Sequence, residues 1–275
     1  MWAGGKNKML ENYMPLMPSV ENVNSYVEPF FGGGAMFIHM KKYYHMKKII
    51  INDINISIMN IYKSIRDDYD SFIKRVIELE TKYMPLKKEE RKKYYFDLRH
   101  EHSYDYEKWN TTIESATLYF LMKTGFNGIF QINKNTNNRY GTPSGLLNQK
   151  KRVFDLTIIK WWNNALQDVE IRNESWENVC TLDDAFYFFD PPYRDSFADY
   201  GNSFNDDNLL ELIKFANNQK QVFLANRADD DWFENHKMNL NTKIFDVTYT
   251  AGRRKKTATG HEAKKAKEIL LYRIN

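Results

Sequence analysis

Short apolar runs alternate with amphipathic stretches toward both ends of the chain. In the first half, a strand-like run at residues 25–31 ends in Gly32-Gly33-Gly34, and a helical pattern follows at residues 35–40. A second buried-type run covers residues 48–52, and residues 56–65 again show helical periodicity. Strand, glycine loop, helix and strand in this order predict half of a nucleotide-binding α/β unit.

The same alternation returns after about residue 168. The expected strands are rich in β-branched and aromatic residues and cover residues 169–171, 186–189, 221–225 and 268–272. A helix is expected at residues 206–217. Elements from both ends of the chain are therefore predicted to share one α/β sheet.

The middle of the chain has a different pattern. Residues 87–93 form a mixed-charge helical face, and Thr111-x-x-Glu114 resembles a capping box that opens a helix running to Met122. Two short alternating segments around an Asn-rich turn then predict a β-hairpin. We therefore expect an α/β domain from residues 1–60 and 161–275, and a mainly helical insert from residues 61–160 that carries the hairpin.

Composition limits the classes of protein. The chain has 275 residues, of which 42% are hydrophobic and 15% aromatic, as in ordinary folded proteins. No apolar stretch is long enough to span a bilayer, and the N-terminus lacks the apolar core of a secretory signal. A single Cys180, expected in a strand with an inert thiol, excludes an internal disulfide and a Cys-based zinc cluster. We expect a cytoplasmic protein without membrane attachment, metal or obligate protein partner.

Two segments carry candidate chemistry. Asp53 lies about twenty residues after the glycine loop, where an acid can accept both hydroxyls of a ribose. The segment Asp190-Pro191-Pro192-Tyr193 (the DPPY segment) follows an apolar run, and its prolines must end the strand. It presents a carboxylate, peptide carbonyls and an aromatic face, which together can hold a flat hydrogen-bonding ring. A tight structural loop and a plain strand-ending turn are the alternatives.

The order of motifs resembles that of the Dam-type (D12 class) DNA N6-adenine methyltransferases. The segments that carry the resemblance are residues 2–6, 26–35, 52–55, 124–130, 190–193 and 225–229. The resemblance implies a Rossmann-like methyltransferase sheet with a target-recognition insert, and S-adenosyl-L-methionine as the cofactor. By resemblance, the cofactor-binding residues are Trp2, Ala3, Gly4, Lys6, Phe31, Gly32, Gly33, Asp53, Ser175, Trp176 and Asp190.

The resemblance also implies the mechanism. The catalytic residues are Asp190, Pro191, Pro192 and Tyr193. The Asp190 carboxylate and the Pro191 carbonyl would accept the two N6 protons of adenine, and Tyr193 would stack on the flipped-out base.

Double-stranded DNA is the expected partner. A basic cluster offers phosphate contacts through Arg253, Arg254, Lys255 and Lys256, with a solvated tail as the alternative. Base readout is expected from the hairpin region, through Asn127, Asn133, Lys134, Asn135, Asn138 and Arg139.

The resemblance implies methylation of adenine N6 in double-stranded DNA by a phage or bacterial enzyme of the restriction-modification kind, with GATC as the common target of that family. Cytosine N4 or RNA adenine as the acceptor remains an alternative. A catalytically idle relative that only binds DNA is another.

Overall fold

The computed structural model describes residues 9–136, 139–145, 148, 152–194, 204–228, 230–249, 255–257, 260–262 and 264–275. The chain forms two compact units. Among the described residues, the first unit contains residues 53–173, and the second contains residues 9–52 and 174–275. The predicted insert, residues 61–160, falls within the first unit. No helix in the described ranges is long and apolar enough to cross a membrane.

A mixed sheet forms the centre of the second unit. Its strands are β1 (Ser25–Glu28), β2 (Lys48–Asn52), β6 (Phe186–Phe189), β7 (Gln221–Arg227), β8 (Asn241–Tyr249) and β11 (Lys264–Ile274). They lie in the order β2-β1-β6-β7-β11-β8. The first four run parallel, while β11 is antiparallel to both of its neighbours. This arrangement confirms the predicted α/β fold class.

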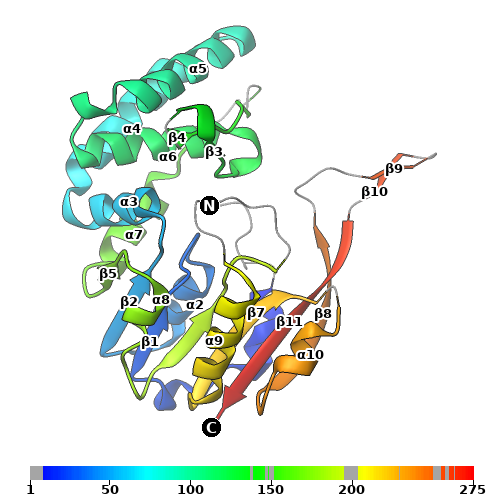
Figure 1. The fold of residues 1–275 in the computed structure, drawn as a ribbon. Coiled ribbons are helices and arrows are strands. Elements are labelled where there is room, and N and C mark those ends of the chain that lie inside the picture. The colour runs from blue at the N-terminus through cyan, green and yellow to red at the C-terminus, as the bar shows by residue number, and fades with distance from the viewer. Residues whose placement is uncertain are drawn as a thin grey trace. The chain divides into compact units, whose positions relative to one another are not determined.

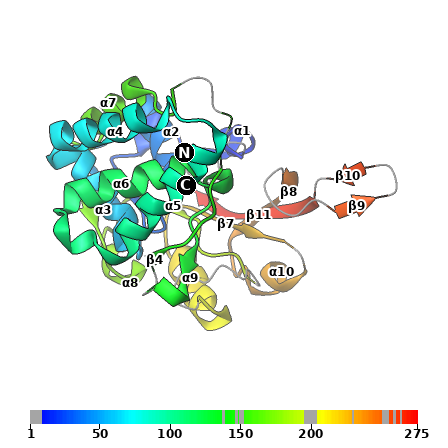
Figure 2. The same cartoon turned by 90° about the horizontal axis from the view of Figure 1, so that it is seen from above.

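Helices cover both faces of this sheet. They are α1 (Leu10–Tyr13), α2 (Ala35–Tyr43), α8 (Trp176–Val179), α9 (Asp206–Asn217) and α10 (Trp232–His236). Figures 1 and 2 show α8, α9 and α10 on one face and α1 and α2 on the other.

The sequence of β6 is typical of a strand that is covered by helices on both faces. All four of its residues are apolar or aromatic and buried, as expected for a central strand covered on both faces. Tyr187 and Phe189 stack and join the core beneath α8 and α9. Phe188, which points the other way, packs against Tyr13 of α1.

Several predicted elements match closely. The strand β2, the strand β6 and the helix α9 have the predicted bounds. The strand β1 ends at Glu28, earlier than predicted, and Pro29 follows it, which has no amide proton for a ladder bond. Beyond β8, the strands β9 (Lys255–Thr257) and β10 (Gly260–Glu262) form an antiparallel pair.

The first unit is mainly helical. Its helices are α3 (Ile56–Asp67), α4 (Tyr69–Tyr83), α5 (Lys88–Tyr104), α6 (Thr111–Thr124) and α7 (Leu156–Ala165). The predicted hairpin is confirmed as β3 (Ile132–Asn133) paired antiparallel with β4 (Arg139–Tyr140), and β5 (Glu170–Arg172) follows α7.

The predicted capping box at Thr111 is wrong. The N-cap of α6 is Asn110, whose side chain accepts a hydrogen bond from the amide of Ile113 at 2.9 Å. Asparagine is among the best N-cap residues, so the helix begins at Thr111, one residue earlier than a Thr111 cap requires. This leaves Glu114 available for contacts outside the helix.

Candidate active site

The strand order reverses between β1 and β6, which are adjacent in the sheet. From β1 the chain goes to β2 on one side, whereas β6 and β7 lie on the other side. In α/β sheets, ligands bind at the carboxyl ends of the strands where the order reverses. The glycine loop follows β1 and the DPPY segment follows β6, so both predicted motifs leave the sheet at this point.

The glycine loop turns sharply after a buried anchor. Phe31 is buried and packs edge-on against Phe37 of α2 at 5.5 Å. Gly32 has φ of +47°, a left-handed conformation that favours glycine, and a Cβ there would meet no atom within 4 Å. Among the described residues, a side chain at Gly32 would therefore meet open space.

Asn52 joins three segments of the second unit. Its side-chain amide donates to the carbonyls of Pro29 and Glu174, both at 3.0 Å, and its Oδ1 accepts from the Glu174 amide at 2.8 Å. Its backbone carbonyl accepts from the amide of Phe31 at 2.8 Å. The buried Asn52 thus fixes the glycine loop, the end of β2 and the approach to Ser175. The sequence offered no signal for this role beyond its place before Asp53.

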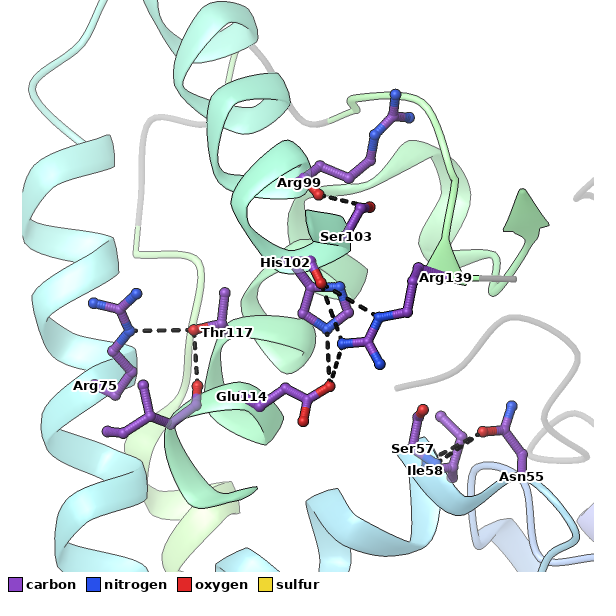
Figure 3. Close-up of polar contacts among 11 residues, drawn as sticks. Asn55, Ser57, Ile58, Arg75, Arg99, His102, Ser103, Glu114, Thr117 and Arg139 are labelled. Carbon is purple, nitrogen blue, oxygen red and sulfur yellow. Dashed lines mark hydrogen bonds and ion pairs between the residues drawn. The ribbon is translucent and has the colours of Figure 1, made fainter. Parts of the chain in front are cut away.

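Asp53 and Asn55 shape the turn after β2 in the first unit. The Asp53 Oδ1 accepts from the Asn55 amide at 2.9 Å. The Asn55 side chain caps α3 by accepting from the amides of Ser57 and Ile58 (Figure 3). The predicted role of Asp53 toward a ribose stays a prediction.

Ser175 and Trp176 begin α8. Ser175 is exposed, as the predicted pair beside an adenine requires. Trp176 is 9% exposed and packs edge-on against Phe215 at 5.9 Å and Phe189 at 6.5 Å. The indole therefore belongs to the core between α8, α9 and β6.

The DPPY segment leaves β6 and is tied to neighbouring strands. Pro191 is buried, while Asp190, Pro192 and Tyr193 are partly exposed. The Tyr193 hydroxyl donates to Oε1 of Glu268 on β11 at 3.0 Å. The next residue, Arg194, donates its amide to Oδ1 of Asn226 on β7 at 3.2 Å.

The side chain of Arg194 anchors the chain further. Its guanidinium lies 2.9 Å from Asp206 and 2.5 Å from Asp230, and it lies over the Trp232 ring at 5.1 Å. A cavity of ≈ 430 Å³ lies beside it, and one motif residue, Pro192, belongs to its lining. The other lining residues are Arg194, Phe204, Asn205, Asp206, Asp207 and Leu209.

Cys180 does not lie in a strand, which corrects that prediction. It follows α8 as the C-cap residue. Burial raises the pKa of the thiol, and the nearby Glu177 carboxylate raises it further. The thiol is therefore held protonated, as an inert cysteine should be.

Arg139 fixes the hairpin of the first unit (Figure 3). Its guanidinium pairs with Glu114, donates to the carbonyl of His102 at 3.1 Å, and lies over the Tyr106 ring at 3.8 Å. Burial lowers the pKa of His102 to about 3, and the Arg139 charge adds to this effect. Arg139 is thus engaged within the unit, so reading a guanine would require it to exchange these partners.

The residues directly after β4, Gly141 and Thr142, are also held by hydrogen bonds. The Tyr95 hydroxyl donates to the carbonyl of Thr142, and Arg99 donates to the carbonyls of Gly141 and Thr142, all at 2.9 Å. A Cβ on Gly141 would lie 2.5 Å from the Asn133 Cβ, so only glycine fits this close approach.

The residues expected to read DNA lie mostly on exposed turns. Lys134 and Asn135 are exposed between the two hairpin strands, and the Asn133 side chain accepts from the Asn135 amide. Asn127 is exposed with φ of 54°, next to Phe126, whose 51% exposure the sequence reasoning missed.

Some predicted residues lie outside the described ranges. These are Trp2, Ala3, Gly4, Lys6, Asn138, Arg253 and Arg254. Lys255 and Lys256 belong to the described strand β9. Among the described residues, no group of His, Cys, Asp or Glu side chains is arranged to hold a metal ion.

Known proteins resemble this chain over most of its length. A family model described as "D12 class N6 adenine-specific DNA methyltransferase" matches residues 2–265. The chain is 32% identical over 247 residues to the "Type II methyltransferase M.MjaIII" of Methanocaldococcus jannaschii, covering 84% of each protein. It is 27% identical over 265 residues to the "Type II methyltransferase M1.LlaDCHI" of Lactococcus lactis subsp. cremoris, covering 91% of this chain and 88% of that protein. It is 23% identical over 246 residues to the "DNA adenine methylase" of Haemophilus influenzae, covering 84% and 79% respectively.

Proposed function

Because the chain belongs to the D12 class N6 adenine-specific DNA methyltransferases, we propose that its DPPY segment carries the methyl transfer and that S-adenosylmethionine is the donor. Members of this family methylate adenine N6 in DNA, which favours this acceptor over cytosine N4 and over adenine in RNA. The observation that most supports this proposal is the reversal of strand order between β1 and β6. The glycine loop follows the carboxyl end of β1, and the DPPY segment follows the carboxyl end of β6.

The residues present fit a nucleoside cofactor. The described residues leave space beside the Cα of Gly32, and Asn52 holds that loop and the segment before Ser175 together. Asp53 directly follows β2, where a carboxylate is suited to ribose hydroxyls. When bound, S-adenosylmethionine supplies an electrophilic methyl group on its sulfonium.

The DPPY segment then acts on the adenine. The N6 lone pair is delocalised into the purine ring, which makes the amine a weak nucleophile. The Asp190 carboxylate and the Pro191 carbonyl accept its two protons as hydrogen bonds, which localises the lone pair on N6. Tyr193 stacks on the base, which offsets the cost of flipping it out of the duplex, on the order of a few kcal/mol. Asp190 also accepts the proton released on transfer.

DNA contacts come from the exposed turns of the first unit in this proposal. Asn127, Lys134 and Asn135 face solvent and carry the hydrogen-bonding groups that base edges recognise. We extend the proposal to GATC as the target, on the resemblance to Dam-type enzymes. The cytoplasm, where DNA is accessible to such an enzyme, is the proposed location.

The test compares two carboxylates at opposite ends of β6. Asp190→Ala should lower single-turnover methyl transfer to duplex DNA by about 100- to 1,000-fold, because the acceptor for the N6 protons is lost. Calorimetry should show that S-adenosylmethionine still binds. Asp184→Ala is the matched control, since Asp184 precedes β6 and is exposed. Transfer that survives in Asp190→Ala contradicts the proposal.

A further inference from the structure

On one side of β6, the strands β7 and β11 continue past the point where β6 ends. Phe189, the last residue of β6, pairs with Leu224 of β7. The strand β7 runs on to Arg227, and β11 stays paired with it, so that Glu268 lies opposite Arg227. The DPPY segment therefore leaves the sheet beside an extension made of two neighbouring strands, which we call the ledge (residues 225–227 and 268–270).

Two buried side chains of the ledge accept hydrogen bonds from the end of the DPPY segment. Glu268 is 3% exposed and accepts from the Tyr193 hydroxyl at 3.0 Å. Asn226 is 0% exposed, and its Oδ1 accepts from the amide of Arg194 at 3.2 Å. One contact fixes an aromatic ring and the other fixes the backbone just after it.

The side-chain nitrogen of Asn226 also indicates that packing alone does not explain this residue. Within the described part of the chain, its Nδ2 is a buried donor without a hydrogen-bond partner. Buried polar groups are nearly always paired, and unpaired ones are costly in a folded protein. An apolar residue would satisfy this position if packing alone mattered. The Asn226 Oδ1 also accepts from the amide of Arg227 at 2.8 Å, and of its two contacts the one to Arg194 reaches the residue after the DPPY segment.

We infer that Asn226 and Glu268 are positioning residues for methyl transfer. They act through the DPPY segment and touch neither base nor cofactor in this account. Glu268 sets the plane of the Tyr193 ring, on which the adenine stacks, and Asn226 holds the chain so that Asp190 and the Pro191 carbonyl face N6. Because small displacements of reacting groups cost large factors in rate, these contacts should govern the transfer step. The inference rests on the proposed role of the DPPY segment.

A double-mutant cycle tests the pair formed by Tyr193 and Glu268. The variants are Tyr193→Phe, which removes one hydroxyl, Glu268→Leu, which removes the acceptor, and the combination of both. Single-turnover transfer is measured with radiolabelled S-adenosylmethionine and unmethylated plasmid DNA. Each single variant should lower the rate constant by about tenfold, and the combination should lower it no further. The affinities for S-adenosylmethionine and DNA should stay within about twofold in Tyr193→Phe.

Conservative variants separate positioning from folding. Glu268→Gln keeps an oxygen acceptor and should restore most of the rate, whereas Asn226→Leu should lower it by about tenfold and Asn226→Asp should lower it less. Melting temperatures are recorded for all of them. An unchanged transfer rate in Tyr193→Phe and Glu268→Leu, or losses that simply multiply in the combination, overturns the inference.

Asp190→Ala is measured in the same assay to keep two failures apart. If Asp190→Ala lowers transfer by about 100- to 1,000-fold while the ledge variants do not slow it, the positioning role is wrong and the proposed function stands. If Asp190→Ala transfers normally, the proposed function itself is wrong.

Discussion

Two short segments of this protein are held in place in opposite ways. The DPPY segment is held at its end: the Tyr193 hydroxyl and the amide of the next residue, Arg194, donate to buried acceptors on β11 and β7. The hairpin β3–β4 instead is held at β4 and at the residues that follow it. Arg139 donates to the carbonyl of His102, and the carbonyls of Gly141 and Thr142 accept from Arg99. Its turn residues Lys134 and Asn135 stay exposed.

The difference matches what each segment is proposed to do. A catalytic segment gains from being fixed at every point, because the reacting atoms must be aligned. A segment that contacts DNA needs a fixed base and an exposed turn, so that its turn residues reach the DNA and differ between enzymes without loss of the fold. The following changes test this contrast, from the largest expected effect to the smallest.

Arg139→Ala should release the hairpin from α5 and α6. The Glu114 carboxylate loses its charged partner while it remains largely buried, so the free energy of unfolding should fall by about 3 kcal/mol. The KM for DNA should rise while S-adenosylmethionine affinity is unchanged.

A matched control for this change is Arg75→Ala. Arg75 donates to Thr117 Oγ1 (Figure 3), pairs with Glu78 in the same unit and lies over the Trp109 ring at 5.5 Å. Among the described residues, none of these contacts involves β3 or β4. It should lower stability without raising the KM for DNA. An equal rise in both variants would show that the effect is general loosening of the unit.

Gly141→Ala should strain the hairpin directly. The new Cβ would lie 2.5 Å from the Asn133 Cβ and 3.1 Å from its backbone nitrogen, neither of which can move freely. We expect a loss of about 2–3 kcal/mol in the free energy of unfolding, measured by urea denaturation. Gly32→Ala, which meets no atom within 4 Å, should cost only about 1 kcal/mol of backbone strain and should weaken S-adenosylmethionine binding instead.

His102 should make stability depend on pH. Burial lowers its pKa to about 3, whereas an exposed histidine titrates near about 6.5. As the pH falls below the pKa of the exposed histidine, His102 of the unfolded chain takes up a proton that it does not bind in the folded chain. The free energy of unfolding should therefore drop by about 2 kcal/mol between pH 7 and pH 5 through this residue. His102→Gln should flatten the profile in this window, and an unchanged slope would argue against a neutral, buried His102.

Lys134→Ala should have the smallest effect on the fold. Lys134 is exposed on the hairpin turn, so stability should change by less than about 0.5 kcal/mol. If Lys134 contacts a phosphate, its replacement should weaken DNA binding. The slope of log K against log salt concentration should also become smaller by about one. A titration of DNA binding at several salt concentrations measures both.

The sequence predicted the parts of the fold that depend on local pattern. The strands β2 and β6 and the helix α9 follow from their runs of apolar or periodic residues, and the hairpin follows from its Asn-rich turn. Proline chemistry placed the end of β6 correctly. The same reasoning was wrong for Cys180, which it placed in a strand. It also chose Thr111 rather than Asn110 as the cap of α6, because both residue types are common at helix N-caps.

What the sequence did not predict depends on residues far apart in the chain. Asn52 bonds a carbonyl 122 residues away, and Glu268 accepts from a hydroxyl 75 residues away. Trp176 was expected beside a cofactor, yet its ring packs on Phe215 of α9. Arg139 was expected to read a base, yet its charge is paired with Glu114. Only the folded sheet and helices bring these partners together.

Modification-sensitive sequencing of DNA from cells that express the protein tests the central claim most directly. Cells that express the unaltered chain should carry N6-methyladenine at one short sequence, and cells that express Asp190→Ala at the same level should carry far less of it there. An equal level of N6-methyladenine at that sequence in the Asp190→Ala cells would contradict the assignment of methyl transfer to the DPPY segment.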